Sequence, residues 1–224
     1  KLPSPINFCA AKHAAPESES SHDYCPVPEP NACAMMKTKR FESRVALVTG
    51  AAAGIGKATA ERLAAEGARL VIADYNYPEA ERLAEQLNRE GAPAFALRFD
   101  ASETESCREI VARTIERYGT IDILVNNVGG SDLSRDLDLL NMDLGYFDEV
   151  FHLNLRSVMA TTQAALPEMT LRNRGSIVNT ASIGGLLGDF RGTLYGAAKA
   201  GVIGLTRYIA SQYGKLGIRC NAVA

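Results

Sequence analysis

Six short apolar runs, each followed by a segment with helical periodicity or by the end of the sequence, most constrain the fold of this chain. The runs are nearly continuous rather than alternating, which is typical of strands buried on both faces of a parallel sheet. We expect these strands at residues 44–50, 68–74, 93–100, 121–127, 174–182 and 217–224. We expect helices at residues 55–68, 78–91, 102–119, 146–171 and 193–214. This order predicts an α/β fold, a Rossmann-type doubly wound parallel sheet in a single domain.

The first forty residues differ in composition from the rest of the chain. They hold six of the nine prolines and three of the five cysteines, and they show neither helical nor strand periodicity. We therefore predict a flexible N-terminal tail over residues 1–40, outside a folded dinucleotide-binding domain over residues 41–224. Met35 or Met36 would be a natural start for the folded part.

Composition excludes several classes of function. The net charge of −2 offers no basic field for a nucleic acid, and no apolar run approaches the ~20 residues that span a bilayer. Five cysteines without a C-x-x-C pair, and only three histidines, favour reduced thiols and no metal site. We expect a cytoplasmic protein that binds neither membranes nor nucleic acids.

The stretch TGAAAGIG, residues 49–56, lies between the first predicted strand and the first predicted helix. In such a strand–turn–helix, Gly50 allows the tight turn, Gly54 lets the backbone approach a diphosphate, and Gly56 lets the helix pack closely on the sheet. The helix N-terminus offers unpaired N–H groups to the phosphate. A glycine-rich turn without a ligand is the alternative.

An acidic residue, Asp74, ends the second predicted strand. A carboxylate at this place can accept hydrogen bonds from an adenosine ribose diol and repels a 2′-phosphate, so it favours NAD over NADP. Lys57 and Arg69 are the nearest basic residues in sequence, and a simple capping role for Asp74 stays open.

Three further side chains form a candidate catalytic group. Tyr195 and Lys199 in the segment YGAAK are four residues apart on a predicted helix and therefore share a face. Ser182 ends the fifth predicted strand, and the carboxyl ends of strands are where sites form in open α/β sheets. Taken singly, each residue also fits an ordinary role in packing, solvation or capping.

Together these segments resemble the short-chain dehydrogenase/reductase family. The matching pieces are TGAAAGIG, Asp74, Asp100, the segment NNVG at residues 126–129, Asn154, Ser182 in NTASIGG, and YGAAK. The resemblance covers residues 44–224. It implies an oxidoreductase that transfers a hydride between NAD(H) and a secondary alcohol or ketone.

The resemblance also implies a role for each catalytic residue. Tyr195 would be the general acid/base, Lys199 would favour its phenolate and hold the nicotinamide ribose, Ser182 would position the substrate oxygen, and Asn154 would hold a water for proton relay. Asn126 would stabilise the central sheet. The residues implied to bind the cofactor are Gly50, Ala53, Gly54, Ile55, Gly56, Asp74, Asp100, Ala101, Asn127, Gly129, Tyr195 and Lys199.

The family continues after NAVA with a substrate loop, a further helix and a final strand. We therefore expect the sequence to be a piece of a longer protein, with an open substrate side. The resemblance implies a homodimer or homotetramer formed by helices 146–171 and 192–213, although core packing explains their apolar residues equally well. Two alternatives stay open for the function. One is an NADPH-dependent 3-oxoacyl carrier-protein reductase, and the other is a dinucleotide-binding sensor without turnover.

Overall fold

The computed structural model describes residues 39–224, which form part of one compact unit, Lys37–Ala224. Residues 1–38 of the predicted tail lie outside the described part. The strands are β1 (Val45–Thr49), β2 (Arg69–Asp74), β3 (Ala94–Arg98), β4 (Ile123–Asn126), β5 (Gly175–Thr180) and β6 (Ile218–Val223). The helices are α1 (Gly54–Ala65), α2 (Tyr77–Arg89), α3 (Thr104–Tyr118), α4 (Phe147–Phe151), α5 (Ser157–Leu171) and α6 (Thr193–Tyr213).

All six strands form one parallel sheet in the order β3-β2-β1-β4-β5-β6. The predicted fold class is therefore confirmed. The five residues of β1 are all buried, as its continuous apolar run predicts. The strand order reverses between β1 and β4, and ligands bind outside the carboxyl ends of strands at such a point.

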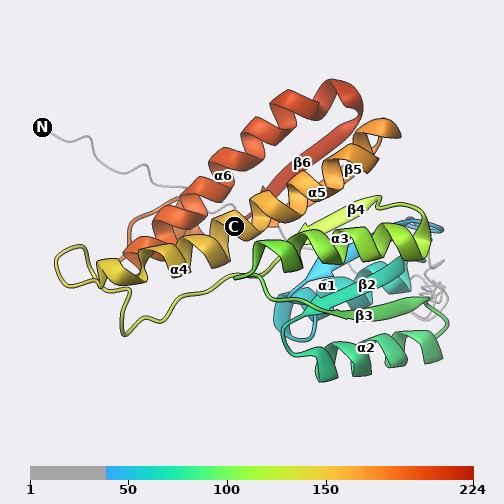
Figure 1. Ribbon diagram of the computed structural model, residues 1–224, viewed down its shortest axis with the longest axis horizontal. Helices are drawn as coiled ribbons and strands as arrows, with labels where there is room; N and C mark the ends of the chain where they lie inside the picture. The colour runs from blue at the N-terminus through green and yellow to red at the C-terminus, as the bar shows by residue number, and fades with distance from the viewer. Residues whose placement is uncertain (1–38) are drawn as a thin grey trace, which may run out of the picture. The chain divides into compact units, whose positions relative to one another are not determined.

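Helices cover the two faces of the sheet in separate groups (Figure 1). Ala46 and Val48 of β1 pack in a core with α1 and α2, whereas Leu47 packs in the opposite core with α3, α5 and α6. The period-2 alternation of side chains along a strand explains why neighbours in sequence enter different cores. This packing fixes the strand ends that carry the candidate site.

The helical segment predicted over residues 146–171 is interrupted by one wider turn. Between α4 and α5 the chain forms a π-helical segment, His152–Arg156. Such segments are rare and frequently lie at functional sites. Asn154, a candidate catalytic residue, lies in this turn and is fully buried.

A hollow of about 1080 Å³ extends over the α1-side face of β4, β5 and β6. Ser182 and Tyr195 line it, and Arg174 and Arg219 line it where β5 and β6 begin. Within residues 39–224, no helix is both long and apolar enough to cross a membrane.

Candidate active site

The glycine-rich turn folds as the sequence predicts. Gly50 and Gly54 both have positive φ, 62° and 55°, a region that glycine adopts without steric cost. A Cβ atom added to Gly56 would lie 2.0 Å from the carbonyl oxygen of Gly50, so only glycine permits this approach of α1 to β1. The turn therefore brings the start of α1 to the carboxyl end of β1.

The N-terminus of α1 has no side-chain cap. Its N-cap residue is Ala53, which has no side-chain acceptor for the first-turn N–H groups. Ile55 in that turn is exposed, and nothing lies within 4 Å of a Cβ built on Gly54. Free amides and open space at a helix N-terminus fit a diphosphate.

Asp74 lies beside this turn with both carboxylate oxygens in use. One oxygen accepts a hydrogen bond from the backbone N–H of Ala52 at 2.9 Å, and the other accepts one from Asn76 at 2.9 Å. Each carboxylate oxygen can accept more than one hydrogen bond, so capacity remains for a ribose diol. Asp74 thus holds the turn and still faces the site.

A second hollow, of about 330 Å³, collects most of the predicted nucleoside contacts. Gly50, Asp74, Asp100, Ala101, Asn127 and Gly129 all line it. Its size and its place at the carboxyl ends of β1, β2 and β4 fit a nucleoside better than a bulky substrate. The structure thus brings these residues together at one place.

Asn127 joins the two halves of the sheet. Its side-chain amide donates to the carbonyl of Gly50 at 3.2 Å, and its backbone N–H donates to the Thr49 hydroxyl at 2.9 Å. Asn126, by contrast, points into the core. Its side chain bonds Asn179 at 2.9 Å and Thr161 at 2.7 Å, which is a structural role.

Asn154 ties the π-helical turn to the loop after β4. Its side-chain oxygen accepts from Gly130 N at 2.9 Å, and its side-chain amide donates to Gly130 O at 2.7 Å and to Val150 O at 2.8 Å. A Cβ on Gly129 would lie 2.7 Å from the Asn154 oxygen and 2.6 Å from Lys199 Nζ. Asn154 and Lys199 are therefore neighbours across Gly129.

Ser182, Tyr195 and Lys199 converge at the carboxyl end of β5. The Ser182 hydroxyl accepts a hydrogen bond from Gly184 N at 3.1 Å and caps a short 3-10 turn. Lys199 Nζ lies 5.6 Å from the centre of the Tyr195 ring and donates to Thr180 O at 2.8 Å. Ser182 and Tyr195 also line the same hollow.

Lys199 is only 1% exposed, and burial lowers the pKa of its ammonium from 10.5 to about 8. The cause is desolvation, because removing a charge from water disfavours the charged form. An ammonium offers three donors, and Thr180 O takes one of them. The two others suit the hydroxyls of a ribose.

Two contacts of the site were not predicted from the sequence. Thr180 contributes its carbonyl to Lys199, and Asp136 lies buried beneath the start of α6 with its carboxylate on the backbone of Leu194 and Tyr195. A backbone carbonyl carries no signal in a sequence. Asp136 is one of several acidic residues in a loop, and no local pattern separates it from the others.

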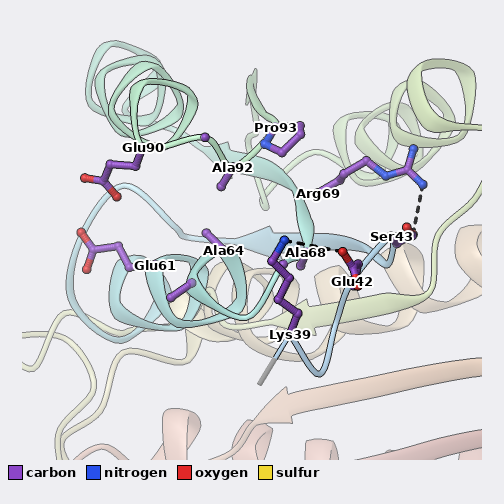
Figure 2. Close-up of a pocket in the computed structure, with 13 residues that line it drawn as sticks. Lys39, Glu42, Ser43, Glu61, Ala64, Ala68, Arg69, Glu90, Ala92 and Pro93 are labelled. Atoms are coloured by element: carbon purple, nitrogen blue, oxygen red, sulfur yellow. Dashed lines mark hydrogen bonds and ion pairs between the residues drawn. The ribbon is translucent and has the colours of Figure 1, made fainter. Parts of the chain in front are cut away.

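A further hollow, of about 810 Å³, lies at the opposite end of the sheet (Figure 2). Arg69, the first residue of β2, and Pro93, just before β3, line it together with Lys39, Glu42 and Glu90. Arg69 donates to the carbonyl of Ser43, and Lys39 pairs with Glu42. Because it lies at the amino ends of the strands, this hollow is separate from the candidate active site.

The comparison with protein families identifies the family to which this fold belongs. The family model described as short chain dehydrogenase matches residues 44–224. The chain belongs to the short-chain dehydrogenase family. As a short-chain dehydrogenase, it is an NAD(P)-dependent oxidoreductase acting on CH–OH groups. The resemblance expected from the motifs is thus confirmed.

Relatives of known name support this placement. The chain is 50% identical to 7alpha-hydroxysteroid dehydrogenase of Bacteroides fragilis over 83% of this chain and 71% of that protein. It is 38% identical to 3-oxoacyl-(acyl-carrier-protein) reductase FabG of Thermotoga maritima over 83% of this chain and 74% of that protein. The crystal structure of gox2181 matches with a TM-score of 0.79 and 34% identity, over 84% of this chain and 74% of that chain.

Proposed function

We propose that this short-chain dehydrogenase transfers a hydride between NAD(H) and a secondary alcohol of hydroxysteroid type or its ketone. The observation that carries the proposal is the convergence of Ser182, Tyr195 and buried Lys199 at the carboxyl end of β5, beside Asn154. The substrate class draws on the similarity to 7alpha-hydroxysteroid dehydrogenases of Bacteroides fragilis and Clostridium sardiniense.

In this proposal each side chain of the site has a separate role in proton transfer. Tyr195 exchanges the proton of the substrate hydroxyl, and the neighbouring Lys199 ammonium favours the phenolate by charge attraction. Ser182 donates a hydrogen bond to the substrate oxygen, and Asn154 holds a water that connects Lys199 with solvent. The bound nicotinamide supplies the hydride chemistry, and the protein orients it.

The surroundings of Ser182 support an apolar substrate. Ile183, Leu186, Leu187 and Phe190 follow it in the chain, and all four are exposed, Phe190 at 95%. Exposed apolar side chains gathered beside a proton-transfer group suit a large neutral ring system, because burial on binding stabilises the complex. Such a surface is unsuited to a small charged acid.

The preference for NAD is part of the proposal and depends on Asp74. Its carboxylate would accept hydrogen bonds from a free 2′-hydroxyl and would repel a 2′-phosphate. A competing charge is Arg98, which pairs with Asp74 in the sheet register and whose guanidinium lies 5.7 Å from the centre of the Tyr75 ring. If NADP were preferred, Arg98 would be the group that binds its phosphate.

A homodimer or homotetramer, in the cytoplasm, completes the proposal. Val158 and Val202 of the predicted interface helices are fully buried in the core and leave no surface for a partner. Met159 and Leu171 of α5 and Tyr208 of α6 are exposed instead and would form the interface. Size-exclusion chromatography with light scattering tests this part, and a monomer would contradict it.

The test is turnover with a panel of hydroxysteroids and simple secondary alcohols, followed by NADH fluorescence. We expect activity with NAD that exceeds activity with NADP, and loss of at least ~100-fold in kcat for Tyr195→Phe with cofactor binding kept. Asp74→Asn should narrow the difference between the two cofactors. Tyr118→Phe, at the end of α3 beside Arg69 and so at the opposite end of the sheet from the site, is the matched control and should keep wild-type turnover.

Other outcomes would select the alternatives. Reduction of 3-oxoacyl thioesters with NADPH, without steroid oxidation, would favour a carrier-protein reductase. Cofactor binding that survives Tyr195→Phe in a protein that turns over no alcohol or ketone would favour a dinucleotide-binding sensor. Each of these results would refute the proposed function.

A further inference from the structure

We propose that Asp136 is a positioning residue that fixes Tyr195 by capping helix α6 from a distant loop. The proposal rests on the proposed role of Tyr195 as acid/base. Asp136 lies 59 residues before Tyr195 in the sequence, and its side chain is fully buried.

The carboxylate bonds directly to the backbone of the catalytic turn. One oxygen accepts from Leu194 N at 2.8 Å, and the other accepts from Tyr195 N at 2.9 Å. Helix α6 begins at Thr193, so these are N–H groups of its first turn, which have no acceptor within the helix. Asp136 therefore satisfies two donors at the position that carries the phenol.

The helix has no cap of its own. The N-cap residue is Gly192, which lacks a side chain and has a φ of 80°. Its backbone N–H donates to Asp136 O at 2.7 Å, and the Thr193 hydroxyl donates to Leu137 O at 2.9 Å. The loop thus supplies what Ser, Thr, Asn or Asp supplies at an ordinary N-cap.

The loop that carries Asp136 is itself held at both ends. Before it, Gly130 exchanges two hydrogen bonds with Asn154. After it, Asp143 pairs with Arg135, and the Arg135 guanidinium lies 4.0 Å from the centre of the Tyr146 ring. This loop therefore bonds to two candidate catalytic residues, to Asn154 through Gly130 and to the backbone of Tyr195 through the Asp136 carboxylate.

Substitution of the carboxylate by a carboxamide isolates this role. Asp136→Asn keeps size and shape, but the amide has one acceptor oxygen, and its NH₂ group would face the other backbone N–H. The first turn of α6 would shift or loosen. Small displacements of a reacting group lower the rate of the chemical step while leaving binding intact.

The experiment compares steady-state kinetics of three variants. We expect Asp136→Asn to lower kcat about 10- to 100-fold, with KM and the NADH dissociation constant within about twofold of wild type. Asp138→Asn makes the same chemical change at an exposed site in the same loop. It should leave kcat, KM and the NADH dissociation constant unchanged. Thr193→Val removes the neighbouring hydrogen bond from the Thr193 hydroxyl to Leu137 O and leaves the carboxylate in place. It should lower thermal stability, and its loss of kcat should be smaller than that of Asp136→Asn.

Amide hydrogen exchange in the wild-type protein tests the contact even where Asp136→Asn fails to fold. The amides of Leu194 and Tyr195 should exchange at least ~10-fold more slowly than that of Ile55, which lies in the uncapped first turn of α1. Equal exchange, an unchanged kcat in Asp136→Asn, or equal losses of kcat in Asp136→Asn and Thr193→Val would overturn the inference. Absence of turnover in the wild type would refute the proposed function instead, which separates the two failures.

Discussion

The buried ammonium of Lys199 should cost this protein stability, and Lys199→Met should recover part of it. Methionine has nearly the length of lysine and carries no charge, so it fills the same space without the desolvation cost. We expect the variant to be more stable and, if Lys199 has its proposed role, inactive. A gain of stability on removing a catalytic side chain is typical of functional sites.

The magnitude follows from the pKa. The decrease from 10.5 to about 8 means that the fold disfavours the charged form, by roughly 3.4 kcal/mol at 1.36 kcal/mol for each pKa unit. The variant also loses the hydrogen bond to Thr180 O, which offsets about 1–1.5 kcal/mol. The net gain in the free energy of unfolding at pH 7 is therefore about 2 kcal/mol.

The change with pH in the stability difference between Lys199→Met and the wild type gives the sharper test. Because the pKa of Lys199 is lower in the fold than in the unfolded chain, the unfolded state binds more protons between pH 8 and 10.5. Stability of the wild type therefore rises with pH across that window, relative to the variant, and the cost is fully present below pH 8. The advantage of Lys199→Met should accordingly shrink as the pH is raised from 7 to 10.

Urea unfolding followed by circular dichroism, at pH 7 and at pH 10, measures both quantities. Taking the difference between variant and wild type cancels the titration of all other groups. A variant less stable than wild type at pH 7, or a difference that does not change between pH 7 and 10, would refute the reasoning.

Two further substitutions and one labelling experiment have definite expected outcomes. Gly56→Ala places a Cβ 2.0 Å from Gly50 O, so NADH affinity by fluorescence titration should fall at least ~10-fold, and unchanged affinity would contradict the close-approach argument. Asn126→Ala leaves buried hydrogen-bond partners unsatisfied, so urea unfolding should show a loss of about 2–4 kcal/mol while NADH still binds; a loss below ~1 kcal/mol would count against it. Burial raises the pKa of the Cys107 and Cys220 thiols to about 11, so peptide mapping after thiol labelling at pH 8 should find both unmodified unless denaturant is added.

The fold could be predicted because its signals are local. Each strand is a continuous apolar run, and each turn into a helix is marked by glycine, proline or a polar residue, so the six strands and the doubly wound order follow from the sequence. The glycine turn and the four-residue spacing of Tyr195 and Lys199 are also local patterns. These local signals placed the predicted site at the carboxyl ends of the strands.

What could not be predicted depends on contacts between distant segments. The π-helical turn at Asn154 forms where the helix meets the loop after β4, and no periodicity in that stretch marks it. The low pKa of Lys199 arises from burial by the complete fold. Asp136 acts on residues 58 and 59 positions away, and its own surroundings in the sequence are those of an ordinary acidic loop.

These distant contacts connect the two parts of the proposed site at the carboxyl ends of the strands, one for the cofactor and one for proton transfer. The glycine turn and Asp74 follow β1 and β2, where we propose that the nucleotide binds, and Tyr195 lies on α6, which covers the opposite face of the sheet from α1. The relative position of these groups is therefore set by the segments that bridge them. Asn127 bonds the glycine turn to the end of β4, and the loop after β4 then bonds the π-helical turn and, through Asp136, the start of α6. One continuous segment, 126–136, therefore connects the proposed cofactor site to the proposed proton-transfer site. A dehydrogenase needs that connection, because hydride and proton leave the same alcohol and both acceptors must be fixed relative to it.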